Sequence, residues 1–110
     1  MTFMSNKYFA IKQEYKGLKF ASKKELNRYL ELEILEKNKY IANLETHPKF
    51  DLMVNGIKIG RYTADFRYLD QSGVSIVEDV KSKATKTRDY MLRKKILATY
   101  NPPIHIKEIL

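Results

Sequence analysis

Hydrophobic and polar positions along the chain repeat with two periods, which predict two helices among a series of short strands. Helical spacing is clearest over residues 22–40, where Ser22 is a predicted N-cap and apolar residues recur every three or four positions. A second helix is predicted over residues 87–100, ended by Asn101-Pro102-Pro103. Each helix should pack its apolar side on a sheet.

The remaining apolar runs are short and extended. Lys16-Gly17 joins residues 8–15 and 18–20 in a predicted N-terminal hairpin, and Asn55-Gly56 is a strong signal for a type I′ hairpin. Strands are predicted over residues 41–44, 50–54, 57–59, 62–68, 74–81 and 104–109. Those between residues 50 and 81 follow one another through short turns, which predicts an antiparallel meander.

This order of elements predicts an α+β (α/β/α-like) fold with a mixed central sheet, a strand meander and flanking helices. The last strand should return through the second helix and lie parallel to the strand that ends at Lys81. No repeat, low-complexity tract or linker interrupts the sequence. Residues 1–110 are therefore predicted to form a single domain.

The residue types in the chain narrow its chemistry. It has no cysteine, and His47 and His105 are its two histidines. Disulfides, thiolate zinc sites and cysteine nucleophiles are thus excluded, a metal would be held by oxygen, and both histidines are interpreted as structural. No apolar run reaches the roughly 18 residues of a membrane span, and the N-terminus lacks the apolar core of a signal peptide. We expect a soluble protein of the cytoplasm that has no membrane partner.

The chain is strongly basic, with a net charge of +8, and its charged residues are unevenly distributed. Residues 1–24 carry six lysines and one glutamate, and residues 81–95 carry seven basic residues and one aspartate. Residues 25–80 hold ten acidic and seven basic residues. Carboxylates flanked by basic segments are typical of a phosphate-binding surface, and nucleic acid is the expected polyanionic partner. A solvated lysine face is the alternative.

Strand alternation predicts that Asp65, Asp79 and Lys81 lie together. Asp79 and Lys81 share one face of strand 74–81, whereas Glu78 points to the other face, as a salt-bridge partner or in an edge position. If strands 62–68 and 74–81 pair, Asp65 lies near Asp79. Two close carboxylates repel unless a proton or cation neutralises them, and Mg²⁺ suits carboxylates and phosphate oxygens. An exposed ion cluster at the strand ends is the alternative.

The acid-x-Lys triplet is weak evidence by itself. It occurs at Glu14-Tyr15-Lys16 and Asp79-Val80-Lys81, and about two occurrences are expected by chance in this composition. The second triplet ends an apolar strand and follows an in-phase carboxylate 14 residues earlier. Its partnership with Asp65 therefore gives it weight.

The order of these features resembles the PD-(D/E)XK nuclease superfamily. It is an acid at a helix start, an Asp on a strand, acid-x-Lys on the next strand and then a basic helix. The stretches GLKFASKKE, YTADFRYL and VEDVKSKATKTRDYMLRKK are similar to a short, phage-encoded family within it. The resemblance covers residues 17 to about 108 and implies a restriction-endonuclease-like core. The sequence departs from the pattern at Ala64, where proline is usual, at Asp79, where Glu is commoner, and at Ser82, where glycine is expected.

The resemblance implies a role for each matching residue. Asp65 and Asp79 would bind Mg²⁺, with Mn²⁺ as the alternative ion, Lys81 would serve the attacking water, and Glu25 would assist the metal or its waters. Glu25 also has a structural explanation, as the partner of Ser22 in a capping box. Glu78 is left outside the site.

The predicted function is that of a Mg²⁺-dependent DNA endonuclease, structure-specific for branched DNA such as a Holliday junction, in phage recombination or replication. A homodimer is expected if the substrate is a junction, because paired cuts need two active sites. The rivals are a non-catalytic nucleic-acid-binding module and an adaptor for an acidic protein. Tyr90 and Tyr100 are expected in the core. Five basic residues after the triplet are predicted to contact phosphates, and a solvated face is their alternative: Lys83, Lys86, Arg88, Arg93 and Lys94.

Overall fold

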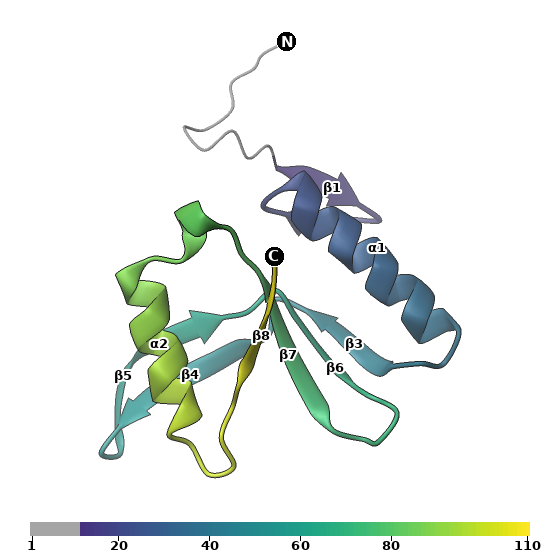
Figure 1. Ribbon diagram of the computed structural model, residues 1–110. Coiled ribbons are helices and arrows are strands. Elements are labelled where there is room, and N and C mark those ends of the chain that lie inside the picture. The colour runs from purple at the N-terminus through teal and green to yellow at the C-terminus, as the bar shows by residue number, and fades with distance from the viewer. Residues whose placement is uncertain (1–11) are drawn as a thin grey trace.

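The computed structural model describes residues 12–110, and the α+β class predicted from the sequence is confirmed (Figure 1). The elements in chain order are β1 (Gln13–Tyr15), β2 (Leu18–Phe20), α1 (Lys23–Lys37), β3 (Ala42–Thr46), β4 (Lys49–Val54), β5 (Ile57–Thr63), β6 (Phe66–Leu69), β7 (Ser75–Val80), the 3-10 helix η1 (Lys83–Thr85), α2 (Arg88–Ala98) and β8 (Ile106–Ile109). Part of the predicted N-terminal hairpin, residues 8–11, lies outside the described residues.

A mixed sheet with strand order β3-β6-β7-β8 forms the centre of the fold. β6 pairs antiparallel with β7, and β8 returns through α2 to pair parallel with β7, as predicted. The predicted meander is only partly right, because β4 and β5 pair with each other in a separate two-stranded sheet and β3 pairs with β6.

A bend at Ala64 and Asp65 explains this difference. The sequence predicted one strand over residues 62–68, but β5 ends before the bend and β6 begins after it. The backbone also changes partner there, since Ala64 N–H donates to Pro48 O and Asp65 N–H donates to Glu78 O. Ala64 packs in the core under α2, whereas Phe66 packs in the core under α1. The chain thus passes from one sheet to the other at Asp65.

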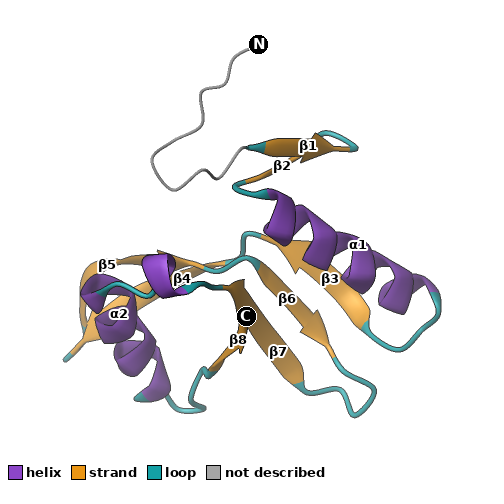
Figure 2. Cartoon of the chain, turned by 45° about the horizontal axis from the view of Figure 1, so that its top comes forward, coloured by secondary structure: helices purple, strands orange, loops and turns teal. Residues whose placement is uncertain are grey.

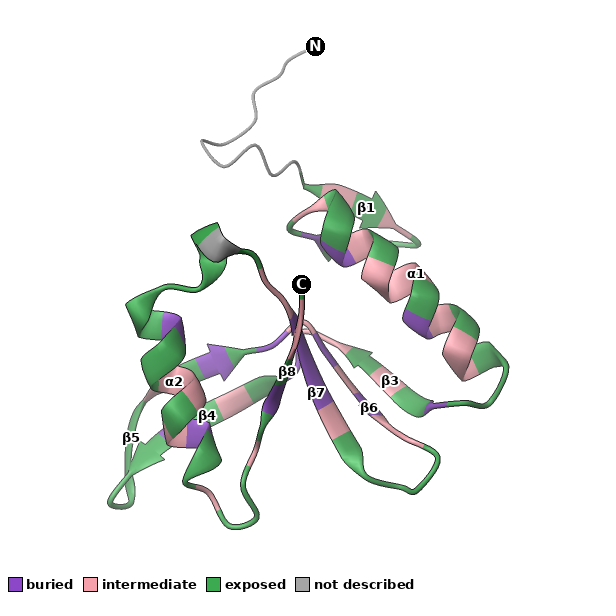
Figure 3. Cartoon of the chain, in the orientation of Figure 1, coloured by how far each residue is buried: buried purple, intermediate pink, exposed green. Residues whose placement is uncertain are grey.

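The two helices cover opposite faces of the central sheet (Figures 1 and 3). α1 buries Leu32 against β6 and β7, in a core that includes Phe66 and Tyr68. α2 buries Tyr90 and Leu97 on the other face. Burying such side chains contributes about 1.5–3 kcal/mol each, so both helices are held mainly by packing. Neither helix in the described part of the chain is long and apolar enough to cross a membrane.

Local sequence signals set the ends of several elements. The Ser22 hydroxyl caps α1 by accepting a hydrogen bond from Glu25 N–H, and the β1–β2 hairpin lies over the same end of the helix (Figure 2). Asn55 and Gly56 have φ values of 51° and 78°, as the predicted type I′ turn requires. The Ser22 cap fixes the first turn of α1, which carries Glu25.

Candidate metal centre

Asp65 lies in the bend where the chain leaves the β4–β5 sheet, and two hydrogen bonds attach it to the end of β7. Its N–H donates to Asp79 Oδ1 at 2.9 Å, and its own Oδ2 accepts from Val80 N–H at 2.7 Å. The predicted proximity of Asp65 and Asp79 is therefore confirmed. The physical basis is the antiparallel register of β6 and β7, which pairs Phe66 with Glu78 and so brings the two aspartates opposite each other.

Asp79 is almost completely buried, with 2% of its surface exposed. Its Oδ1 accepts the Asp65 N–H, but its Oδ2 is buried with no hydrogen-bond partner among the described residues. A buried acceptor that lacks a donor is costly, and most such groups in folded proteins are satisfied by a partner. A proton or a cation at Oδ2 would remove this cost.

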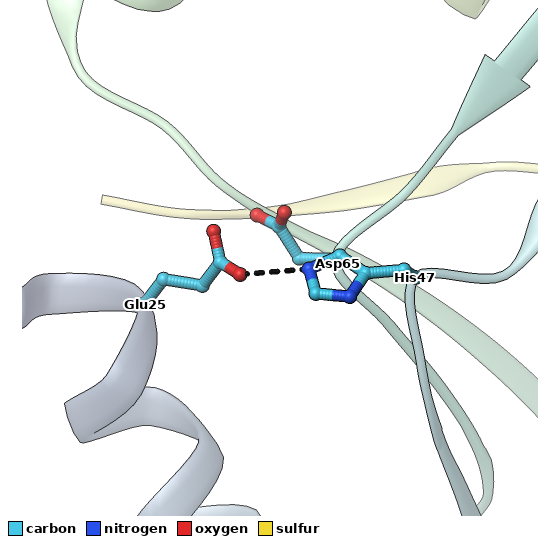
Figure 4. A group of neighbouring side chains, drawn as sticks. All are labelled: Glu25, His47 and Asp65. Carbon is cyan, nitrogen blue, oxygen red and sulfur yellow. Dashed lines mark hydrogen bonds and ion pairs between the residues drawn. The ribbon is translucent and has the colours of Figure 1, made fainter. Parts of the chain in front are cut away.

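Glu25 belongs to the same site, because its side chain does not take part in the capping box. Its N–H donates to the Ser22 hydroxyl, as a capping box requires, but its carboxylate Oε1 lies 3.0 Å from His47 Nε2 (Figure 4). Only 4% of Glu25 is exposed. The first turn of α1 therefore directs an acid toward Asp65 and the loop that contains His47.

His47, which was interpreted from the sequence as structural, lies beside Glu25 and Asp65. It lies between β3 and β4, with its N–H donating to Asp65 O at 2.9 Å. Ligand atoms from Glu25, His47 and Asp65 all lie within 4.8 Å of one another, which is a spacing that could hold a metal ion (Figure 4). The sequence contains no local signal for this contact, because it depends on the pairing of β3 with the distant strand β6.

Burial raises the pKa values of the carboxyl groups in this site. It raises the pKa of Glu25 to about 7, and the charge of Asp65 adds to the rise, whereas the hydrogen bond with His47 opposes it. Burial also raises the pKa of Asp79 to about 6, against the charge of Lys81. Burial raises the pKa of Asp65 as well, although the Val80 N–H and Lys81 act against it. The three carboxylates thus need a proton or cation to neutralise them.

Lys81 directly follows β7 and lies on the face predicted from strand phase. Its Nζ is 4.1 Å from the centre of the Tyr90 ring, and Tyr90 OH donates to Glu108 Oε2 at 2.7 Å. The charge of Lys81 acts on both Asp65 and Asp79, as their pKa values indicate. Among the described residues Lys81 forms no ion pair, so its ammonium group is available to a ligand at the site.

The basic residues after Lys81 are less free than the sequence predicted. Lys86 and Lys94 each place Nζ 3.0 Å from a carboxylate oxygen of Glu108, and together with Tyr90 they lower its pKa to about 2. Arg93 pairs with Asp89. Arg88 is exposed at the start of α2, and the side chain of Lys83 lies outside the described part of the structure. Of these residues, Lys86 and Lys94 meet at Glu108, which is opposite Asp79 in the β7–β8 register.

Glu78 is turned away from the site, as predicted. It is fully buried and forms a bidentate ion pair with Arg28 of α1, and it also accepts a hydrogen bond from Tyr68 OH. The salt-bridge interpretation is confirmed, whereas the edge position is wrong because β7 lies between β6 and β8. Tyr90 is buried in the core, and Tyr100 packs against the same core, as expected.

The donor set fits a divalent cation. Glu25 and Asp65 offer carboxylate oxygens, and His47 offers an imidazole nitrogen. The Asp79 carboxylate, whose Oδ2 is unsatisfied, adjoins this group through its bond to the Asp65 N–H. Oxygen and imidazole donors together suit divalent ions of the first transition series, and carboxylates suit Mg²⁺ and Mn²⁺. A cation here would carry the charge that otherwise favours protonation of these acids.

A family model described as "Protein of unknown function (DUF1064)" matches residues 5–109. No curated protein and no solved structure matches the chain. The family description assigns no activity. The match spans nearly the whole sequence, and the chain belongs to the DUF1064 family.

Proposed function

We propose that this protein is a metal-dependent DNA endonuclease that hydrolyses phosphodiester bonds, with Mg²⁺ or Mn²⁺ as the cation. The observation that carries the proposal is the meeting of Asp65, Asp79 and Lys81 at the end of β7, with Glu25 completing a buried acidic cluster. These residue types are the ones that such hydrolysis requires, and they come from three separate parts of the chain: α1, the bend at Asp65 and the end of β7. A merely solvated ion cluster would be exposed, whereas Glu25 and Asp79 are buried and Asp65 is half-buried.

Each residue has a chemical role in this proposal. Asp65, Asp79 and Glu25 would hold the cation, and the chemistry it would supply when bound is that of a Lewis acid for the phosphate. The ammonium group of Lys81 would orient the attacking water and offset negative charge that develops on the phosphate. Its position over the Tyr90 ring fixes where that charge acts.

Binding of DNA is supported by the net charge of +8 and by the basic residues that follow Lys81. Arg88 is exposed, and Lys86 and Lys94 lie together on the α2 side of the site, where both pair with Glu108. Phosphate contacts of this kind position a duplex without reading its sequence. We therefore propose recognition of DNA structure, with branched DNA such as a four-way junction as the substrate and a homodimer as the form that makes paired cuts.

A cytoplasmic location, and a role in phage recombination or replication alongside a partner protein, belong to the same proposal. The phage role rests on the resemblance of three sequence motifs to phage nucleases.

The test is incubation of the protein with linear, flapped and four-way-junction DNA in Mg²⁺, Mn²⁺ or EDTA. We expect cutting that requires a divalent cation and is abolished by Asp65→Asn and by Lys81→Ala. Asp51→Asn and Lys58→Ala are matched controls, since these residues form an exposed ion pair on the β4–β5 hairpin. Both control variants should cut normally.

The opposite result would be DNA binding that EDTA leaves unchanged, with no cutting of any substrate. That result would reject the enzyme and favour the non-catalytic nucleic-acid-binding module.

A further inference from the structure

We infer that His47 is a metal ligand, and that it makes this site select a divalent ion of the first transition series over Mg²⁺. This inference deepens the proposed function, on which it rests for taking the acidic cluster as a cation site. It assigns a ligand that the sequence motifs did not indicate, and it chooses between two ions that they left open.

The first support is the contact between His47 and Glu25. Nε2 and Oε1 are 3.0 Å apart, and ligands at adjacent positions of an octahedral ion with bonds of about 2.1 Å are separated by about 3.0 Å. The atoms that share a proton in this contact can therefore share a cation. The ligand atom of Asp65 lies within 4.8 Å of both, so three donors of two chemical kinds converge.

The second support is that the backbone holds His47 in place. Its N–H donates to Asp65 O, and the next residue, Pro48, accepts from Ala64 N–H through its carbonyl. The loop is thus attached on both sides of the bend that positions Asp65. A tilted contact with Phe20, whose ring centre is 6.3 Å away, restricts the imidazole ring. Ligands held in position in this way need little reorganisation to bind an ion.

The third support is the unsatisfied oxygen of Asp79. Asp79 exposes only 2% of its surface, and its Oδ2 has no hydrogen-bond partner within the described residues. The same carboxylate binds the Asp65 backbone through Oδ1. This oxygen is independent of the Glu25–His47 contact, and it points to a ligand beside Asp65.

The choice of ion follows from donor chemistry. Mg²⁺ is a hard ion that favours oxygen donors and keeps several waters, whereas imidazole suits ions of the first transition series. Among these ions Mn²⁺ binds such sites most weakly, so it is the most demanding probe of the inference. A site with one imidazole among its carboxylates should still prefer Mn²⁺ to Mg²⁺.

The experiment measures binding of Mn²⁺ to the untagged protein without DNA, so it does not depend on cleavage. Electron paramagnetic resonance of free Mn²⁺ gives the affinity, and competition with Mg²⁺ gives the selectivity. Electron spin echo modulation from nitrogen reports directly on an imidazole ligand. His47→Gln keeps a hydrogen-bonding side chain but supplies no imidazole, and His105→Gln is the control, since these are the two histidines of the chain.

We expect nitrogen modulation in the unmodified protein and in His105→Gln, and its loss in His47→Gln together with about a tenfold fall in the preference for Mn²⁺. His47→Asn is a second variant, because asparagine tolerates the positive φ of 54° at this position. Unchanged selectivity in both His47 variants, or Mn²⁺ bound without nitrogen modulation, would overturn the inference. Absence of Mn²⁺ binding in the unmodified protein would overturn it as well.

Failure of the two proposals can be told apart. Cutting in Mg²⁺ with unchanged selectivity in the His47 variants would reject the ligand role of His47 and leave the nuclease standing. If the protein binds Mn²⁺ through nitrogen but cuts no DNA, the nuclease proposal is rejected and the ligand role of His47 stands.

Discussion

Arg28 and Glu78 form a bidentate ion pair that joins α1 to β7, with Nε–Oε1 and Nη2–Oε2 distances of 2.8 Å and 2.7 Å. Glu78 is fully buried, and Arg28 lies one helical turn after Glu25. The pair therefore holds the helix that carries Glu25 against the strand that carries Asp79. It supports the site by fixing the position of these two elements.

Glu78→Gln should destabilise the protein by about 3 kcal/mol, because it leaves the Arg28 charge without its buried partner. Urea unfolding measures the change. Glu45→Gln is the matched control, because Glu45 also binds an arginine, Arg67, through two oxygens but at the surface. It should cost less than about 1 kcal/mol. Equal losses in the two variants would contradict the claim that burial makes the Arg28 pair important.

In EDTA the protein should become less stable as the pH rises from about 5 to about 8. Glu25 and Asp79 bind protons more tightly in the folded state, with pKa values of about 7 and about 6, than in the unfolded chain, where both lie near 4. The stability they contribute is full below the unfolded values and is lost as the pH rises through the folded ones. Each pKa unit corresponds to about 1.4 kcal/mol, so the loss should be a few kcal/mol.

Urea unfolding at both pH values checks this expectation, and Glu25→Gln should reduce the difference because glutamine resembles the protonated acid. Saturating Mn²⁺ should restore more stability at the higher pH, where the carboxylates are ionised. Greater stability at the higher pH in EDTA would contradict the account.

Tyr90 should have two separable roles. Tyr90→Phe removes the hydrogen bond to Glu108 but keeps the ring beneath Lys81, so it should cost about 1.5–3 kcal/mol of stability and retain most cleavage. Tyr90→Leu also removes the ring and should slow cleavage about tenfold further, which equals about 1.4 kcal/mol of lost positioning. Single-turnover cleavage rates distinguish the two variants. Similar rates would show that the ring does not position Lys81.

Glu108→Gln should strengthen DNA binding, because Lys86 and Lys94 would no longer be neutralised by a carboxylate. The gain should appear as a steeper salt dependence, by about one unit in the slope of log K against log salt for each lysine that now contacts phosphate. Fluorescence anisotropy of labelled DNA across a KCl series measures it. A weaker affinity with the same slope would mean that Glu108 serves chiefly to hold the two lysines in place.

Local sequence signals predicted the parts of the structure that depend on neighbouring residues. Ser22 caps α1, Asn55-Gly56 forms its turn, and the alternation of strand residues places Asp79 opposite Asp65 and turns Glu78 away. Each of these results follows from a fixed period or from a backbone preference that is visible within a few residues.

What the sequence did not predict depends on contacts between distant segments. The bend at Asp65 contains neither glycine nor proline, and residues 62–68 alternate without interruption, so the change of sheet leaves no local trace. His47 reaches the site only because β3 pairs with β6. Glu108 forms ion pairs with two of the lysines that were predicted to bind phosphate, only because β8 lies beside β7.

The adjacent carboxylates of β7 offer the most direct test of the central claim, which is that the face carrying Asp79 and Lys81 is an active centre. The measurement is single-turnover cleavage of a labelled four-way junction in Mn²⁺ by Asp79→Asn and Glu78→Gln, at a temperature where both variants are folded. We predict that Asp79→Asn slows cleavage by about a thousandfold, whereas Glu78→Gln retains most of the rate despite its lower stability. Normal cleavage by Asp79→Asn would contradict the account.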